Sequence, residues 1–285
     1  MHLPKPPISR LIATLLMAFA ASLAALPASA VAEATMPAWQ VLEFEEKAFL
    51  VTAQARIEVP QPKAGAAQWQ LNMEGSVQSS FERIDVDFEP EDLRISMRER
   101  LSKGRGARLK SWNYQEEFIL RKRQTPANNS KVPPRDWPIT SVLRMEYPAA
   151  ASDIAVSTPY MLLLLADRLR LEGMGATEEV LVQTDRNFYR ARLTVGPGER
   201  LRTDYRLNGK GRVKELRHTT TVTIEVEPEG QLPEKDDFSL LGLYGEITIY
   251  FDRDTGLPLR LRGDAPRLGT TDIDLRAATL RPAST

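Results

Sequence analysis

Hydrophobic and polar residues alternate along much of the chain, which is the pattern of a β-strand with one buried face. The clearest example spans residues 216–226, where Leu, His, Thr, Val, Ile and Val occupy every second position and define one expected strand face. A shorter alternating stretch ends just before it at Asn208-Gly209, a pair that tolerates the positive φ angles of a tight hairpin turn. The pattern therefore predicts a β-hairpin over residues 200–227.

The same alternation predicts strands on both sides of this hairpin. Those expected before it lie around residues 41–59, 81–88, 93–101, 112–120 and 139–147. A stretch rich in proline and asparagine, residues 125–138, predicts a loop between the last two of them. Three short strands are expected after the hairpin, and they should form an antiparallel meander over residues 247–251, 257–261 and 271–277.

One segment has the composition of a buried helix, residues 159–171. Thr158 followed by Pro159 is typical of a helix start, and Gly173 favours a stop. The five residues from Met161 to Leu165 are all apolar, so the helix must be buried against a sheet. The sequence thus predicts a mainly β protein: a strongly curved antiparallel sheet, half-barrel or barrel-like, with one buried apolar helix.

The N-terminus has the three zones of a secretory signal peptide. Basic Lys5 and Arg10 precede an apolar run over residues 11–25, and Ala28-Ser29-Ala30 follows as a small-residue cleavage pattern. The run is about 15 residues long, whereas a membrane-spanning helix needs about 20. We predict a signal peptide over residues 1–30, cleaved near Ala30, with an uncleaved anchor as the alternative. The protein would then be exported, to the periplasm or beyond.

The remainder, residues 31–285, is expected to be a single β-rich domain, with a division near 125–138 as the alternative. It contains no second run of 18 apolar residues, so we do not expect it to be integral to a membrane. It also contains no cysteine, which excludes disulfides and a lipid-attachment thiol. The full sequence has 38 basic and 38 acidic residues, and without Lys5 and Arg10 the remainder has a slight acidic excess, which argues against nucleic-acid binding.

Few residues offer catalytic or metal-binding chemistry. His218 is the only histidine outside the signal peptide, and packing within a strand explains it better than general-base catalysis. The turn at Asp252 resembles the start of a calcium loop, but Gly263 stands where such a loop has its bidentate glutamate. We therefore predict no metal ion and no cofactor. Carboxylate pairs that could serve a hydrolase are Asp85 with Asp87 and Asp272 with Asp274.

The C-terminal pattern carries a family resemblance. Residues 245–252, an acidic turn, and the strand from Gly256 to Leu261 with its Leu257-Pro258 pair are followed by the last strand, residues 271–277. This order resembles the end of an uncharacterised family of bacterial periplasmic β-proteins, a domain of unknown function. It is more loosely similar to the half-barrels that carry lipoproteins across the periplasm. The resemblance implies a curved sheet with a helix on its concave side and, for the carriers, an apolar cavity for acyl chains.

Three functions follow as hypotheses. In the first, a non-enzymatic binding protein holds a lipid, an acyl chain or an envelope component in a cleft lined by Met161, Leu162, Leu164 and Leu165, although core packing explains the same run. In the second, glycines 104 and 106 form a basic hairpin tip that contacts an anionic envelope protein or polymer through Arg105, Arg108 and Lys110. The third is a carboxylate-based hydrolase, for which no nucleophile or cofactor motif is visible.

Overall fold

The structure is a computed structural model, and it describes residues 36–48, 51–62, 66–77, 80–104, 106–127, 131–230, 236–266 and 268–282. All of them belong to one compact unit, residues 34–285. The predicted signal peptide and its cleavage position near Ala30 lie outside the described residues.

Strands dominate the described chain, and they join into one sheet of fifteen. Their bounds are β1 Trp39–Ala48, β2 Val51–Glu58, β3 Trp69–Val77, β4 Ser80–Phe88, β5 Ile95–Lys103, β6 Arg108–Tyr114, β7 Phe118–Gln124, β8 Ile139–Glu146, β9 Val156–Ser157, β10 Thr177–Gln183, β11 Phe188–Leu207, β12 Gly211–Pro228, β13 Tyr244–Asp252, β14 Pro258–Ala265 and β15 Gly269–Leu280. The α-helix is α1 Leu162–Leu169, and the 3-10 turns are Pro134–Asp136, Ala149–Ser152, Pro159–Met161 and Arg170–Glu172.

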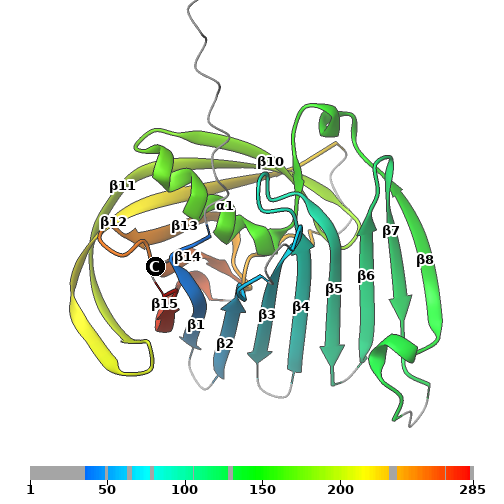
Figure 1. The fold of residues 1–285 in the computed structure, drawn as a ribbon, viewed down its shortest axis with the longest axis horizontal. Coiled ribbons are helices and arrows are strands. Elements are labelled where there is room, and N and C mark those ends of the chain that lie inside the picture. Colours follow the sequence, from blue (N-terminus) through cyan, green and yellow to red (C-terminus); the bar gives the residue numbers. More distant parts are fainter. Residues whose placement is uncertain are drawn as a thin grey trace, which may run out of the picture. The chain divides into compact units, whose positions relative to one another are not determined.

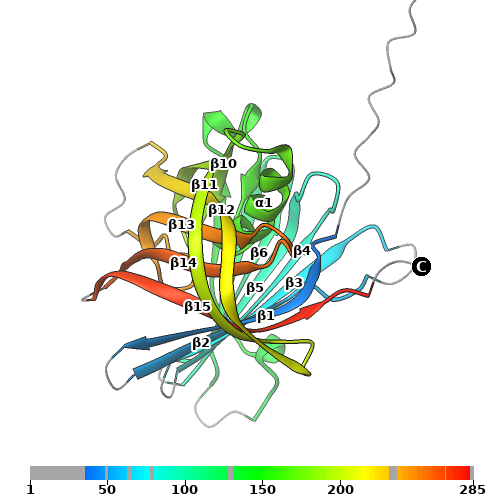
Figure 2. The same cartoon turned by 90° about the vertical axis from the view of Figure 1, so that its left-hand side faces the viewer.

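The sheet is a continuous meander that curves back on itself. Its strand order runs from β8 down to β1, then through β15 down to β9, because the last long strand pairs with the first. Neighbours are antiparallel except β9 with β10. A short parallel pairing of β15 with β11, between residues 277–278 and 206–207, closes β11 to β15 into a ring. Figure 1 shows β1 to β8 side by side, and Figure 2 shows the long strands β11 and β12 curving past β13, β14 and β15.

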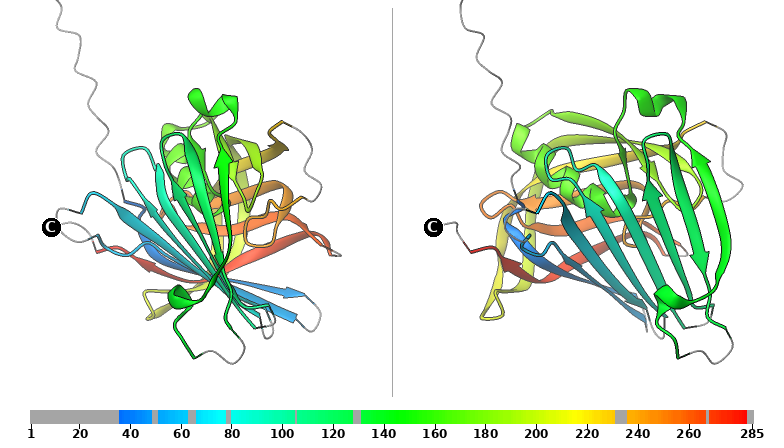
Figure 3. Two further views of the ribbon diagram at one scale, coloured as in Figure 1. Left: turned by 90° about the vertical axis from the view of Figure 1, so that its right-hand side faces the viewer. Right: turned by 45° about the vertical axis from the view of Figure 1, so that its right-hand side comes forward.

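The predicted fold class is confirmed: the protein is mostly strand, in one large curved antiparallel sheet with a single α-helix among the described residues. Figure 3 shows the helix and the curved sheet from two further sides. The expected hairpin is also confirmed, with Asn208 at φ 51° and Gly209 at φ 66° in the turn between β11 and β12. Residues 41–59 form two paired strands, β1 and β2. Strands β3, β9 and β10 and the first half of β11 were not predicted, and the single strand expected over residues 112–120 is instead two paired strands, β6 and β7.

The predicted face of β12 is buried along only part of its length. Leu216 and His218 are exposed, whereas Val222 and Ile224 are buried. β12 pairs with β13 only over residues 219–224, so its earlier residues extend beyond that neighbour. A bulge between Pro197 and Arg200 adds one residue to β11 and reverses the alternation of β11, whereas β12 alternates without interruption.

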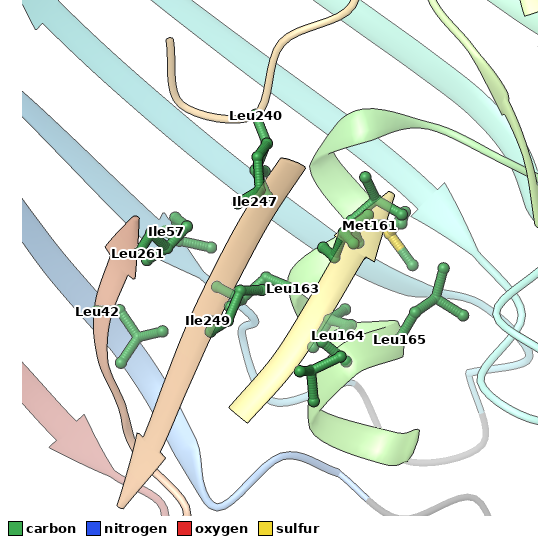
Figure 4. Packing of buried hydrophobic residues seen from close by; sticks show 14 of the residues in the cluster. Leu42, Ile57, Met161, Leu163, Leu164, Leu165, Leu240, Ile247, Ile249 and Leu261 are labelled. Atoms are coloured by element: carbon green, nitrogen blue, oxygen red, sulfur yellow. The ribbon is translucent and has the colours of Figure 1, made fainter. Parts of the chain in front are cut away.

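The helix lies inside the sheet and fills part of its interior. Leu162 to Leu165 are at most 5% exposed and join the main hydrophobic core. Figure 4 shows Leu163 beside Ile249 of β13. The helix is apolar on nearly all sides because strands surround it, and Gly173, at φ 101°, ends the 3-10 turn Arg170–Glu172 that directly follows it. Thr158, expected as its cap, makes no capping hydrogen bond. Within the described residues, no helix combines the length and hydropathy needed to cross a membrane.

Candidate functional site

The candidate site is a cavity of about 740 Å³ on the inner face of the sheet. Apolar side chains line one side, from β1 to β3, β15 and the segment after residue 236: Phe44, Ala53, Ala55, Met73, Leu241 and Ile273. Charged and polar side chains line the other side, from β4 to β6 and the loop between β10 and β11: Glu82, Arg98, Arg100, Arg108, Lys110, Asp185 and Arg186. The cavity therefore has an apolar wall, lined mainly from β1 to β3 and β15, beside a charged wall, lined mainly from β4 to β6.

The cavity exists because side chains become smaller along the same strands. On β2 the inward residues run from Ile57 to Ala55 and Ala53, and on β3 they run from Leu71 to Gly75. The large members pack in the helix-containing core, whereas Ala53, Ala55 and Gly75 line the cavity. Small side chains leave space that neighbouring groups do not fill. The sequence of each strand thus decides where the core stops and the cavity starts.

The charged wall is set by the register of β5 with β6. Arg100 lies opposite Lys110, Ser102 opposite Arg108, and Arg98 opposite Trp112. Because alternate residues of a strand share a face, these even-numbered positions all point inward. On the next strand, Arg121 lies opposite Trp112. Cations from three consecutive strands are thereby gathered on one side of the sheet, and those of β5 and β6 line the cavity.

Asp185 is the anion at the centre of this wall. It accepts hydrogen bonds from Lys110 Nζ at 2.6 Å and from Arg121 Nε and Nη2 at 2.8 and 3.2 Å. Burial opposes ionisation of Asp185, but the hydrogen bonds and charges of Lys110 and Arg121 outweigh it and hold the pKa of its carboxyl below the ordinary value. Burial lowers the pKa of the Lys110 ammonium despite this partner. The site holds a carboxylate between two cations.

Arg98 is buried beside this group, at 2% exposure, and its partners are uncharged. Its guanidinium donates to the carbonyl and side-chain oxygens of Gln183 at 2.9 and 2.8 Å and to the carbonyl of Thr184 at 2.6 Å. It also stacks on Trp112, 3.8 Å from the ring centroid. Tyr114 donates to the same Gln183 side chain at 2.9 Å, and burial raises the pKa of Tyr114 to about 12.

The loop that carries Asp185 is held from its other side by Asp237. This carboxylate accepts hydrogen bonds from Thr184 Oγ1 at 2.7 Å, Asn187 Nδ2 at 2.8 Å and the backbone N–H of Asp185 at 3.1 Å. The loop is therefore fixed between the cationic wall and the segment after residue 236. Two separate sets of hydrogen bonds place the Asp185 carboxylate.

Two other cations of the wall have different environments. Arg100 donates to both oxygens of Glu82, at 2.7 and 2.9 Å, so its charge is balanced by a neighbouring strand. Arg108 donates to the carbonyl of Gly106 at 3.2 Å. Among the residues with described positions, no carboxylate lies within ion-pair distance of Arg108.

The helix residues predicted to bind a ligand lie elsewhere. Met161, Leu162, Leu164 and Leu165 are buried in the hydrophobic core and are absent from the cavity lining. The chain reaches the cavity just before them, through Pro159 and Tyr160. A ligand-binding role for the four side chains stays a prediction, while their placement in the core matches the packing interpretation.

Two of the residues predicted for the exposed hairpin tip line the cavity instead. The hairpin of β5 and β6 forms as expected, but Arg108 and Lys110 line the cavity, and Lys110 is buried. Arg105 lies outside the described residues. Sequence reasoning missed Gln183, Asp185 and Asp237, for which the only local signal was the polar turn 184–187 between two strands. Contact of the tip with an anionic envelope partner stays a prediction.

The other candidate residues have local roles. Asp252 accepts hydrogen bonds from Asp254 N and Thr255 Oγ1, as expected of an aspartate in a turn. The carboxylates considered for a hydrolase have donors nearby: Asp85 with Arg83, Asp87 with Gln70, Asp272 with Arg262 and Asp274 with Arg260. Within the described part of the chain, no group of three or more histidine, cysteine or acidic residues is arranged to hold a metal ion.

The chain was compared with protein families, curated proteins and solved structures. No protein-family model matches the chain, and no curated protein matches it in sequence. Among solved structures, it is similar to a β-barrel-like protein of the domain of unknown function DUF1849 from Brucella abortus, with a TM-score of 0.48 and 9% identity, over 85% of this chain and 96% of that one. That protein, like the family expected from the sequence, is a β-protein of unknown function. The expected periplasmic location and the likeness to lipoprotein carriers stay predictions.

Proposed function

We propose that this protein is an exported, non-enzymatic binding protein that holds a lipid or an acyl chain in its internal cavity. The observation that supports this proposal is the cavity of about 740 Å³, which is lined by an apolar wall and a charged wall. Ligand sites in proteins are concave, mostly between about 300 and 1,000 Å³, and lined by apolar side chains with a few placed polar groups. An amphipathic ligand matches both walls.

Packing requirements alone do not account for the cavity. The helix already fills the apolar interior at one end of the sheet, with core residues of β1 to β4 packed around it. At the other end the inward positions of β2 and β3 change to alanine and glycine, although larger side chains would bury more apolar surface there. Small residues at these positions leave a space that an apolar chain could fill.

The test is binding by the purified protein, with one variant that fills the cavity. Ala55 lines the cavity, so Ala55→Trp should block it, whereas Thr52→Trp adds the same side chain at an exposed position of the same strand. We expect lipid to co-purify with the wild type in native mass spectrometry, and a fluorescent fatty acid to bind both it and Thr52→Trp. Ala55→Trp should bind at least about tenfold more weakly, a loss of about 1.4 kcal/mol. No lipid and no binding by the wild type would contradict the proposal, and equal binding by both variants would exclude this cavity.

A further inference from the structure

The charged wall of the cavity has more cations than carboxylates. Glu82 pairs with Arg100, and Asp185 serves Lys110 and Arg121 together. Arg98 contacts only uncharged oxygens, and Arg108 has no carboxylate partner among the described residues. Two further carboxylates line the cavity, but Glu46 and Asp237 accept from neutral donors. Around Lys110, positive charge is in local excess.

This excess is concentrated on β6. Burial is the main reason that the pKa of Lys110 lies below its ordinary value, and the charges of Arg121 and Arg108 lower it further. Arg108 and Lys110 are two residues apart on one strand and face the same cavity. A bound anion at this position would offset the repulsion between these cations.

The wall already holds one oxyanion, which shows the geometry available to another. The Asp185 carboxylate uses one N–H donor of Lys110 and two of Arg121. An ammonium has three donors and a guanidinium has five, so Lys110 and Arg108 keep donors for a second acceptor. The apolar wall formed by Phe44, Ala55 and Met73 lies in the same cavity.

We propose that the cavity selects amphiphiles with an anionic head group, a carboxylate or a phosphate, which Arg108 and the remaining donors of Lys110 bind. The hydrocarbon chain lies along Phe44, Ala55 and Met73. This inference rests on the proposed function and adds to it the chemical class of the ligand and the residues that recognise it.

The test compares ligands that share one chain and differ in the head group. Oleic acid, oleoyl lysophosphatidic acid and monoolein carry a carboxylate, a phosphate and a neutral glycerol ester, and at about pH 8 both acids are ionised. We expect both acids to bind the full-length mature protein at least about tenfold more tightly than monoolein, with the preference decreasing as salt is added. A preference for either acid over the other identifies the head group.

Variants assign the preference to Arg108. Arg108→Gln should weaken binding of both acids about tenfold and leave monoolein unchanged, because only the charged contact is lost. Lys122→Gln removes the same charge from an exposed position on β7 and should change nothing. Equal affinity of the wild type for all three ligands overturns this inference but leaves the proposed function intact. An equal loss for all three in Arg108→Gln overturns the assignment, and no binding of any ligand overturns the proposed function as well.

Discussion

The two ends of the inner face of the sheet differ sharply although the same strands form both. At one end α1 is enclosed by apolar side chains such as Ile57, Leu71 and Ile84. At the other end β2 to β6 present small or charged side chains to a cavity. The difference shows that the interior is divided into a part that stabilises the fold and a part kept open. Burying the short apolar helix requires only the part that stabilises the fold.

Two buried or half-buried carboxylates make the same contrast in electrostatic terms. Asp167 of α1 is 5% exposed, and burial raises the pKa of its carboxyl despite the neighbouring Arg170. Burial also opposes ionisation of Asp185 at the cavity, but Lys110 and Arg121 lower its pKa more than burial raises it. One neighbouring cation does not outweigh the effect of burial on the pKa of Asp167, whereas two cations do outweigh it at Asp185.

The largest effect should come from the helix end. Leu163→Ala removes a side chain that is 1% exposed, and we expect a loss of about 2 to 5 kcal/mol in the free energy of unfolding because a cavity is left in the core. Leu171→Ala, at a position 64% exposed, is the matched control and should change it by less than about 0.5 kcal/mol. Urea unfolding of both variants measures the difference, and equal losses would contradict the assignment of the core.

A smaller effect is expected at the polar end. Asp185→Asn keeps the shape of the side chain but leaves Lys110 and the buried Arg121 without their carboxylate. Breaking a buried pair costs about 3 to 5 kcal/mol, and the partial exposure of Asp185 reduces our expectation to about 2 kcal/mol. Asp254→Asn, whose exposed carboxylate pairs with Arg217, should cost less than about 1 kcal/mol. A loss at Asp185 no larger than at Asp254 would mean that the network does not stabilise the loop.

The smallest effect is a difference in pH dependence between the two ends. Because the folded pKa of Asp185 is depressed, the stability it contributes is present above its unfolded pKa of about 3.9 and is lost as the pH falls through the folded value. The folded pKa of Asp167 is raised, so its contribution is present below about 3.9 and is lost as the pH rises through the folded value. The stability difference between wild type and Asp185→Asn should therefore shrink on acidification, whereas that between wild type and Asp167→Asn should shift in favour of the wild type. Unfolding midpoints between about pH 2.5 and 6 measure both differences, and slopes of the same sign would contradict the contrast.

The missed and misplaced elements have identifiable causes. Strand β10 was not predicted because its last four residues, Val180 to Gln183, are all buried, so the period-two alternation is absent. Strand β3 contains Asn72 and Gly75, which are weak strand formers. The expected face of β12 is buried along only part of its length because β13 pairs with residues 219–224 alone, and no signal within β12 itself marks that limit. The errors at β10 and β12 reflect their surroundings in the sheet, whereas the error at β3 reflects its own weak strand formers.

The sequence by itself determined the local structure: the alternation of most strands, the Asn208-Gly209 turn and an apolar segment that had to be buried. It also placed Arg108 and Lys110 near one hairpin. Only the tertiary structure decided that these cations face inward, because alternation shows which residues share a face but not which face the curved sheet encloses. It also brought Asp185 from the β10–β11 loop onto the wall, since pairing between strands distant in the sequence depends on the whole sheet. The cavity and its charge are therefore properties of the assembled sheet.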